Sequence, residues 1–172
     1  MFVITHALVP VVTAQALALT LHAFGRRNPF RKRDYLTLMV AGMMPDLLSP
    51  HLSLEDRWTS FSHTVFSLMI CLPLALWSAR RIAPEHPRIV AVLLYYAVFM
   101  HLLGDALSGG ITWLYPWKTD IIGGRMISFN AWFAWDAWMV GVSTSLAAVR
   151  WWLDRRFLTG ATENCASKRI AE

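Results

Sequence analysis

The sequence has little charge for its length. Only 16% of its 172 residues are Asp, Glu, Lys or Arg, whereas soluble globular proteins carry roughly 25%. Apolar residues make up 56% of the chain, and the mean hydropathy is +0.42. These charges are too few to cover the surface of a water-soluble domain. The composition therefore excludes an ordinary soluble domain and a disordered chain, and it indicates a membrane protein.

Cysteine is also scarce. The chain has two cysteines, Cys71 inside an apolar run and Cys165 in a polar segment near the end. Residues in such different surroundings make a poor pair, which excludes a disulfide framework.

The sequence is rich in long apolar runs. Five stretches predict helices: Phe2–Phe24, Leu36–Ser49, Phe61–Ala79, Ile89–Leu107 and Trp132–Leu153. Crossing a bilayer core of about 30 Å takes about 20 apolar residues, and all but the second stretch are long enough. That stretch either spans a locally thinned bilayer or enters only partway. Bases follow rather than precede the apolar core of the first stretch, so we expect a retained helix rather than a cleaved signal peptide.

The basic residues are distributed unequally between alternating connections. Of the 16 Lys and Arg residues, 13 lie near the end of or after the first, third and fifth stretches, and three (Arg57, Lys118 and Arg125) lie on the other side. The positive-inside rule places the larger group in the cytoplasm. The net charge of +5 therefore indicates membrane orientation rather than a nucleic-acid partner.

These patterns predict an all-α, polytopic membrane helix bundle with about five transmembrane helices. The N-terminus is expected outside and the C-terminus in the cytoplasm. Residues 1–158 are expected to form a single transmembrane domain, and residues 159–172 a polar, mobile cytoplasmic tail.

Five ionisable residues fall at a similar depth near the outer ends of four predicted helices. They are His6, Asp46, His63, His101 and Asp105. Ionisable groups within spans are costly and usually mark function. His101 and Asp105 are spaced i, i+4, which places both on one helix face. Three imidazoles and two carboxylates suit zinc, or else manganese or iron, better than magnesium or calcium. We expect at least one divalent ion, with zinc as the first choice.

Each of these residues also has a structural interpretation. A single membrane histidine is often an interhelical hydrogen-bond partner, Asp46 after Pro45 could cap a helix break, and His63 could bond locally. Their joint occurrence at one depth favours a site. Asp136, at the start of the fifth helix, is a further candidate ligand, or alternatively a charge that stabilises a helix start. His51, in the outer connection, is a candidate by position alone.

Several short motifs occur in a set order. They are Thr5-His6, Gly42-Met43-Met44-Pro45-Asp46, Phe61-Ser62-His63-Thr64, His101-Leu102-Leu103-Gly104-Asp105 and Leu114-Tyr115-Pro116-Trp117. In this order and spacing, residues 1–120 resemble the YdjM-like family of bacterial membrane-bound metal-dependent hydrolases and, more distantly, zinc-dependent phospholipase C proteins. The resemblance implies a helical hydrolase of the bacterial inner membrane. It also implies that the metal ligands are His6, Asp46, His63, His101 and Asp105.

The chain departs from that family at two places. Leu48 stands where family members often have a second Asp, and Trp58-Thr59 stands where they often carry a His-Arg pair. The missing donors argue against a fully occupied second metal site.

A hydrolase of this kind would use a metal-activated water, with Asp105 or Asp46 as the general base. Lys118 and Arg125, in the outer connection, could hold an anionic headgroup, or they could simply be solvated. Because the site lies at the outer headgroup level, we expect a membrane lipid or lipid-linked phosphoester as substrate, with the site facing the periplasm or exterior.

Two other functions would use the same cluster. In one, the protein is a metal-ion or proton transporter, although the inner halves of the predicted spans are largely apolar, with His22 the main exception. In the other, the ion ties helices together without catalysis.

Overall fold

The computed structural model describes residues 3–26, 28–50, 53, 56–124, 126 and 128–170, with side chains described no further than residue 155. The elements in chain order are α1 (Val3–Ala23), α2 (Lys32–Leu48), η1 (Asp56–Thr59), η2 (Phe61–His63), α3 (Val65–Ile82), α4 (Pro87–Gly109) and α5 (Phe129–Ile170). Within the described ranges, extended pairing is limited to one isolated bridge between Ile111 and Ile122. The all-α prediction is confirmed.

Three of the helices are long and apolar enough to cross a membrane. They are α1, α3 and α4. Each also turns large apolar side chains outward, such as Met69 and Leu74 on α3 and Val92 on α4. The passage of α2 and α5 through the bilayer, and the orientation of the bundle, stay predictions.

Local capping sets where two of the helices begin. Thr64 has an extended backbone, and its side chain accepts a hydrogen bond from the Ser67 amide at 3.4 Å, as an N-cap residue does. The third helix therefore begins at Val65 rather than at Phe61, and His63 falls in the separate turn η2. Pro87 begins α4 at a position where its missing N–H leaves no bond unmade.

Helix α4 lies at the centre of the bundle. It packs against α1, α2 and α3, and it carries the longest run of buried residues, including Ala97, Val98 and Leu102. Small side chains recur at the helix contacts, among them Ala14 on α1 and Ala79 on α3, which allows close approach of the backbones. The polar end of α4 is thereby enclosed by three neighbouring segments.

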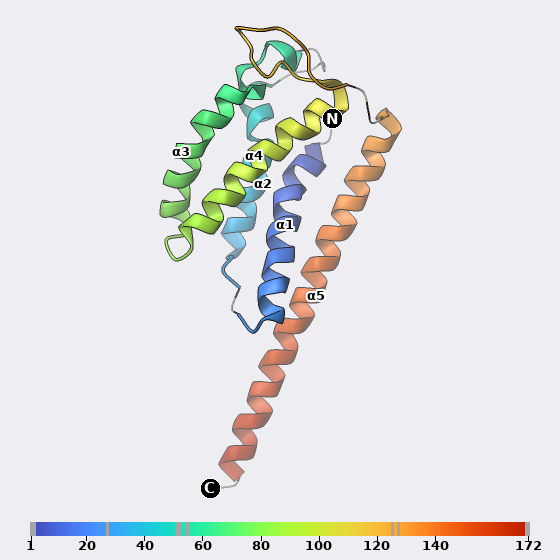
Figure 1. The fold of residues 1–172 in the computed structure, drawn as a ribbon. Coiled ribbons are helices and arrows are strands. Elements are labelled where there is room, and N and C mark those ends of the chain that lie inside the picture. Colours follow the sequence, from blue (N-terminus) through green and yellow to red (C-terminus); the bar gives the residue numbers. More distant parts are fainter. Residues whose placement is uncertain are drawn as a thin grey trace.

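Helix α5 runs beside α1 and continues well past the end of the bundle (Figure 1). It begins at Phe129, slightly before the predicted stretch, and reaches Ile170. The helix thus includes most of the segment expected to be a tail, and the mobility of that segment stays a prediction. Near its start, Asp136 accepts hydrogen bonds from the backbone N–H of Thr5 at 2.9 Å and from its hydroxyl at 2.5 Å. Asp136 therefore holds the first turn of α1, which includes His6, against α5.

Candidate metal centre

Alternating helix directions bring the predicted ligands together. His6 lies at the start of α1, Asp46 at the end of α2, His63 just before α3, and His101 and Asp105 near the end of α4. In an up-and-down arrangement these positions share one end of the bundle (Figure 1). The structure thus places all five residues in one region.

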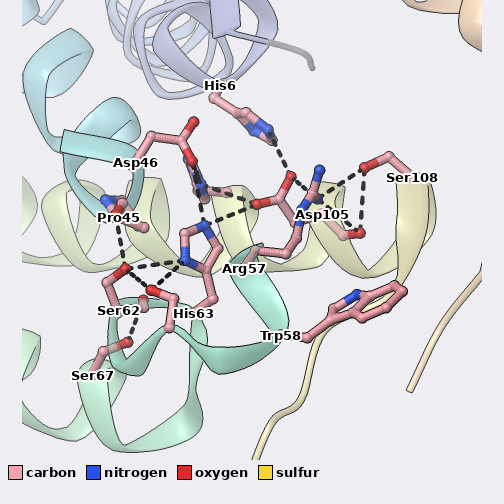
Figure 2. A network of polar contacts seen from close by, with 12 residues as sticks. His6, Pro45, Asp46, Arg57, Trp58, Ser62, His63, Ser67, Asp105 and Ser108 are labelled. Atoms are coloured by element: carbon pink, nitrogen blue, oxygen red, sulfur yellow. Dashed lines mark hydrogen bonds and ion pairs between the residues drawn. The ribbon is translucent and has the colours of Figure 1, made fainter. Parts of the chain in front are cut away.

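Four of the five converge on a common point. Each of Asp46, His63, His101 and Asp105 offers one ligand atom, and these atoms all lie within 4.8 Å of one another. The Nε2 atom of His63 lies 3.3 Å from Asp46 Oδ1 and 3.2 Å from Asp105 Oδ2. The Nε2 atom of His101 lies 3.4 Å and 3.3 Å from the same two oxygens. Figure 2 shows one nitrogen of the His63 ring directed at both carboxylates.

These spacings fit the edges of a metal coordination shell. Ligands about 2.0–2.1 Å from a tetrahedral zinc ion lie roughly 3.3 Å from one another. Charge-assisted N–H···O hydrogen bonds are shorter, at about 2.7–2.9 Å. The four nitrogen-to-oxygen distances, from 3.2 to 3.4 Å, match the coordination shell better than direct ion pairs.

Hydrogen bonds to the far side of each ring fix which nitrogen faces the carboxylates. His101 Nδ1 lies 2.7 Å from the Gly42 carbonyl, which can only accept, so Nδ1 carries a proton. Ser62 donates to the Pro45 carbonyl at 2.8 Å, and its oxygen lies 3.0 Å from His63 Nδ1. In the neutral His101 ring the lone pair is then on Nε2, aimed at the common point, as in metal-binding histidines, and the Ser62 contact allows His63 the same tautomer. The donor set, the spacing and the ring tautomers all fit a divalent ion.

His6 lies beside the four donors rather than among them. Its Nε2 is 3.4 Å from Asp105 Oδ1, and its ring centroid is 4.1 Å from that of His101. Two glycines allow this position. A Cβ at Gly104 would lie 2.7 Å from His6 Cε1, and one at Gly42 would lie 2.1 Å from the His6 carbonyl oxygen.

A fully buried arginine completes the cluster. The Nη1 atom of Arg57 lies 2.5 Å from Asp105 Oδ1, on the side away from the common point, and 3.3 Å from the Ser108 hydroxyl (Figure 2). Asp105 therefore has one oxygen committed to Arg57 and the other directed at the four-atom centre. The guanidinium of Arg57 lies against the Asp105 oxygen that faces away from the four-atom centre, and the number of ions that the centre holds stays a prediction.

The carboxylates also act on His63, which lies outside the apolar spans. Burial lowers the pKa of His63, but the carboxylates of Asp105 and Asp46, which lie 3.2 and 3.3 Å from its Nε2, outweigh burial and hold the pKa above the ordinary value. A proton on His63 would therefore compete with a metal ion for Nε2.

The remaining candidates lie apart from this centre or outside the described residues. Asp136 binds Thr5 and does not join the four converging atoms. Lys118 is exposed in the connection after α4. His51 and Arg125 fall outside the described residues.

Sequence reasoning missed Arg57, Ser62 and the two glycines. Arg57 entered only as one of three bases on the outer side, where a loop position suggests a solvated charge. Its position was the available signal. Arg57 lies six residues before His63, so the segment that brings His63 to the two carboxylates also brings Arg57 near them.

Comparison with known families supports the resemblance carried by these motifs. The model of the YdjM inner membrane protein family matches residues 1–165, nearly the whole chain. The chain belongs to this family. Searches of curated proteins and of solved structures gave no significant match. YdjM membership and the apolar helices identify an inner membrane protein that carries a His/Asp cluster able to bind a metal ion.

Proposed function

We propose that this YdjM protein is a membrane-bound metal-dependent hydrolase that acts at the outer face of the membrane on a lipid or lipid-linked phosphoester. The convergence of two imidazoles and two carboxylates at one end of an apolar bundle carries the proposal. Burying ionisable groups in a membrane protein costs free energy, so a buried cluster of this kind usually marks a functional site.

His63, His101, Asp46 and Asp105 would hold the ion, with zinc the first choice and manganese or iron the second. If a coordination position stays open beside these four ligands, a bound ion would supply an acidified water and polarise a phosphoryl oxygen. Its four protein ligands differ in access. The side chains of His63, His101 and Asp105 are almost fully buried, whereas Asp46 is 19% exposed. Substrate would therefore approach from the Asp46 side.

The two carboxylates are suited to different roles. Asp105 is paired with Arg57 and faces both histidines, so it is held as a fixed anionic ligand. Asp46 lies at the open side and at the end of its helix. We therefore assign proton transfer from water to Asp46 and positioning to Asp105, because a general base needs access to the water it deprotonates.

The surroundings of the centre support a lipid substrate. Leu47 and Leu48, next to Asp46, are more than half exposed, and Trp117 is exposed in the connection after α4. An apolar rim beside a polar centre suits a molecule with a phosphate group and acyl chains. Lys118 and Arg125 are proposed headgroup contacts. The excess of bases in the connections at the opposite end of the bundle supports an outer location for the centre.

Metal content and turnover, measured on the full chain in detergent, test the proposal. We expect the wild type to copurify with a divalent ion and to release phosphorylated headgroup or acyl product from phospholipid. His101→Ala and His63→Ala should lose both, while His86→Ala, an exposed histidine at the start of α4, should lose neither. Retention of metal by both site variants would overturn the site.

Two further outcomes would replace hydrolysis with another function. Metal binding without turnover of any phospholipid would favour an ion that only ties the helices together. Metal uptake into liposomes without turnover would favour a transporter. A periplasm-active reporter fused to the C-terminus should be silent, and a strong signal would reverse the proposed orientation.

A further inference from the structure

A cavity with both basic and apolar side chains in its wall lies at the end of the bundle opposite to the metal centre. It has a volume of about 390 Å³ and is formed by the last turns of α1, the connection that follows and the middle of α5. The residues that matter here are Leu19, His22, Arg26, Arg150, Leu153 and Asp154. The metal centre and this cavity share no residue.

The two arginines of the cavity differ in how they are held. Arg150 donates from Nη1 to the Tyr35 hydroxyl at 2.9 Å, and its Nε is 3.7 Å from Asp154. These contacts fix the plane of a guanidinium that is 26% exposed. Arg26 is exposed, and its side chain makes no hydrogen bond or ion pair within the described ranges. The Arg150 guanidinium is therefore held in a fixed orientation, and the Arg26 guanidinium is able to contact a ligand.

Exposed aromatic side chains flank the cavity. Phe24, just before its rim, is 77% exposed, and Trp151 and Trp152 on α5 are exposed beside Arg150. Exposed aromatic side chains gather at membrane interfaces. The wall combines these bases with apolar side chains such as Leu19 and Leu153. Basic pockets between helices on the cytoplasmic side are where phospholipid headgroups bind.

We propose that this cavity binds the phosphate of a glycerophospholipid, bridged by Arg26 and Arg150, with the glycerol and the first acyl carbons against Leu19 and Leu153. A guanidinium is suited to phosphate because it presents several N–H donors in a plane. The site binds lipid from the leaflet opposite to the metal centre, and it does not depend on metal or on hydrolysis.

Native mass spectrometry of the full chain in detergent, titrated with phosphatidylglycerol, tests this proposal. A Lys or Arg near the membrane surface contributes about 1 kcal/mol to the binding of an anionic lipid, so its loss should weaken lipid binding about fivefold. We expect that loss for Arg26→Gln and for Arg150→Gln, and no change for Arg80→Gln, an exposed base in the last turn of α3. Because the Arg26 side chain makes no polar contact with the described part of the chain, Arg26→Gln should also leave the unfolding temperature unchanged, which separates lost binding from misfolding.

Two controls identify the ligand. Diacylglycerol, which lacks the phosphate, should bind at least fivefold more weakly, and equal binding of diacylglycerol would overturn the proposal. Inorganic phosphate should not displace the lipid at matched concentration, and displacement would assign the cavity to a soluble phosphate instead. Metal-depleted protein should retain the lipid, so failure of the proposed hydrolase would leave this result intact. Equal lipid binding by all three arginine variants would refute the site.

Discussion

Gly42→Ala is the sharpest test of how the centre is built. A Cβ at this position would lie 2.1 Å from the His6 carbonyl oxygen and 3.3 Å from a side-chain carbon of Pro10. Carbon-to-oxygen contacts in proteins are about 3.3 Å or longer, so α1 and α2 would have to separate by roughly 1 Å. Both obstructing groups belong to α1, and the closest one is backbone, so no side-chain rotation relieves the overlap. Overpacking of this kind costs about 1–3 kcal/mol or more.

The same substitution also disturbs a ligand. The Gly42 carbonyl accepts the 2.7 Å hydrogen bond that orients His101, and movement of α2 pulls this carbonyl away. Loss of such an outer hydrogen bond typically weakens metal binding about 10–100-fold. We therefore expect Gly42→Ala to lower both the unfolding temperature and the zinc affinity.

Alanine substitutions at two other helical glycines serve as controls for Gly42→Ala. A Cβ added at Gly141 on α5 would have no described neighbour within 4 Å, so Gly141→Ala should be neutral or stabilise the helix by up to about 1 kcal/mol. Gly104→Ala meets chiefly the His6 ring, at 2.7 Å, which can rotate, so its effect should be intermediate. Thermal unfolding in detergent and competition for zinc with a chelator measure both quantities. If Gly42→Ala behaved like Gly141→Ala in both assays, the close contact of α1 with α2 and its link to His101 would be refuted.

Three other predictions concern the ion and the start of α1. Removal of metal with EDTA should lower the unfolding temperature, and zinc should restore it, because an ion that binds only the folded chain stabilises it; an unchanged temperature would contradict the centre. Zinc affinity should rise with pH and binding should release protons, since the raised pKa of His63 keeps a competing proton in the metal-free chain; chelator competition at several pH values measures this, and a flat profile would count against His63 as a ligand. Asp136→Ala removes both hydrogen bonds to Thr5 and should destabilise the chain by about 1–2 kcal/mol without changing zinc stoichiometry; loss of the metal would show that Asp136 belongs to the centre.

The sequence predicts the helices and the four donors for a physical reason. Helix periodicity places His101 and Asp105 on one face, and alternating spans bring Asp46 and His63 to the same end. What it does not predict depends on contacts between distant segments. Whether Arg57 is solvated or buried depends on its pairing with Asp105, which becomes visible only once the segment before α3 folds over α4.

Other features of the site depend on approach distances rather than on residue type. Gly42 reads in the sequence as one more small residue of an apolar helix, and only the position of the His6 carbonyl shows why a side chain does not fit there. From the sequence alone, Asp136 fits either a metal ligand or a charge that stabilises the start of a helix. The structure pairs it with the first turn of α1, a helix far away in sequence.

The order in which the ligands lie along the chain has a consequence for biogenesis. Asp46 is synthesised well before His101 and Asp105, so it enters the membrane without the partners that later surround it. If α2 crosses the bilayer as predicted, its end keeps Asp46 near the headgroups during that interval, where water can hydrate the carboxylate. The centre can close only when α4 arrives, because α4 carries two of the four converging ligands.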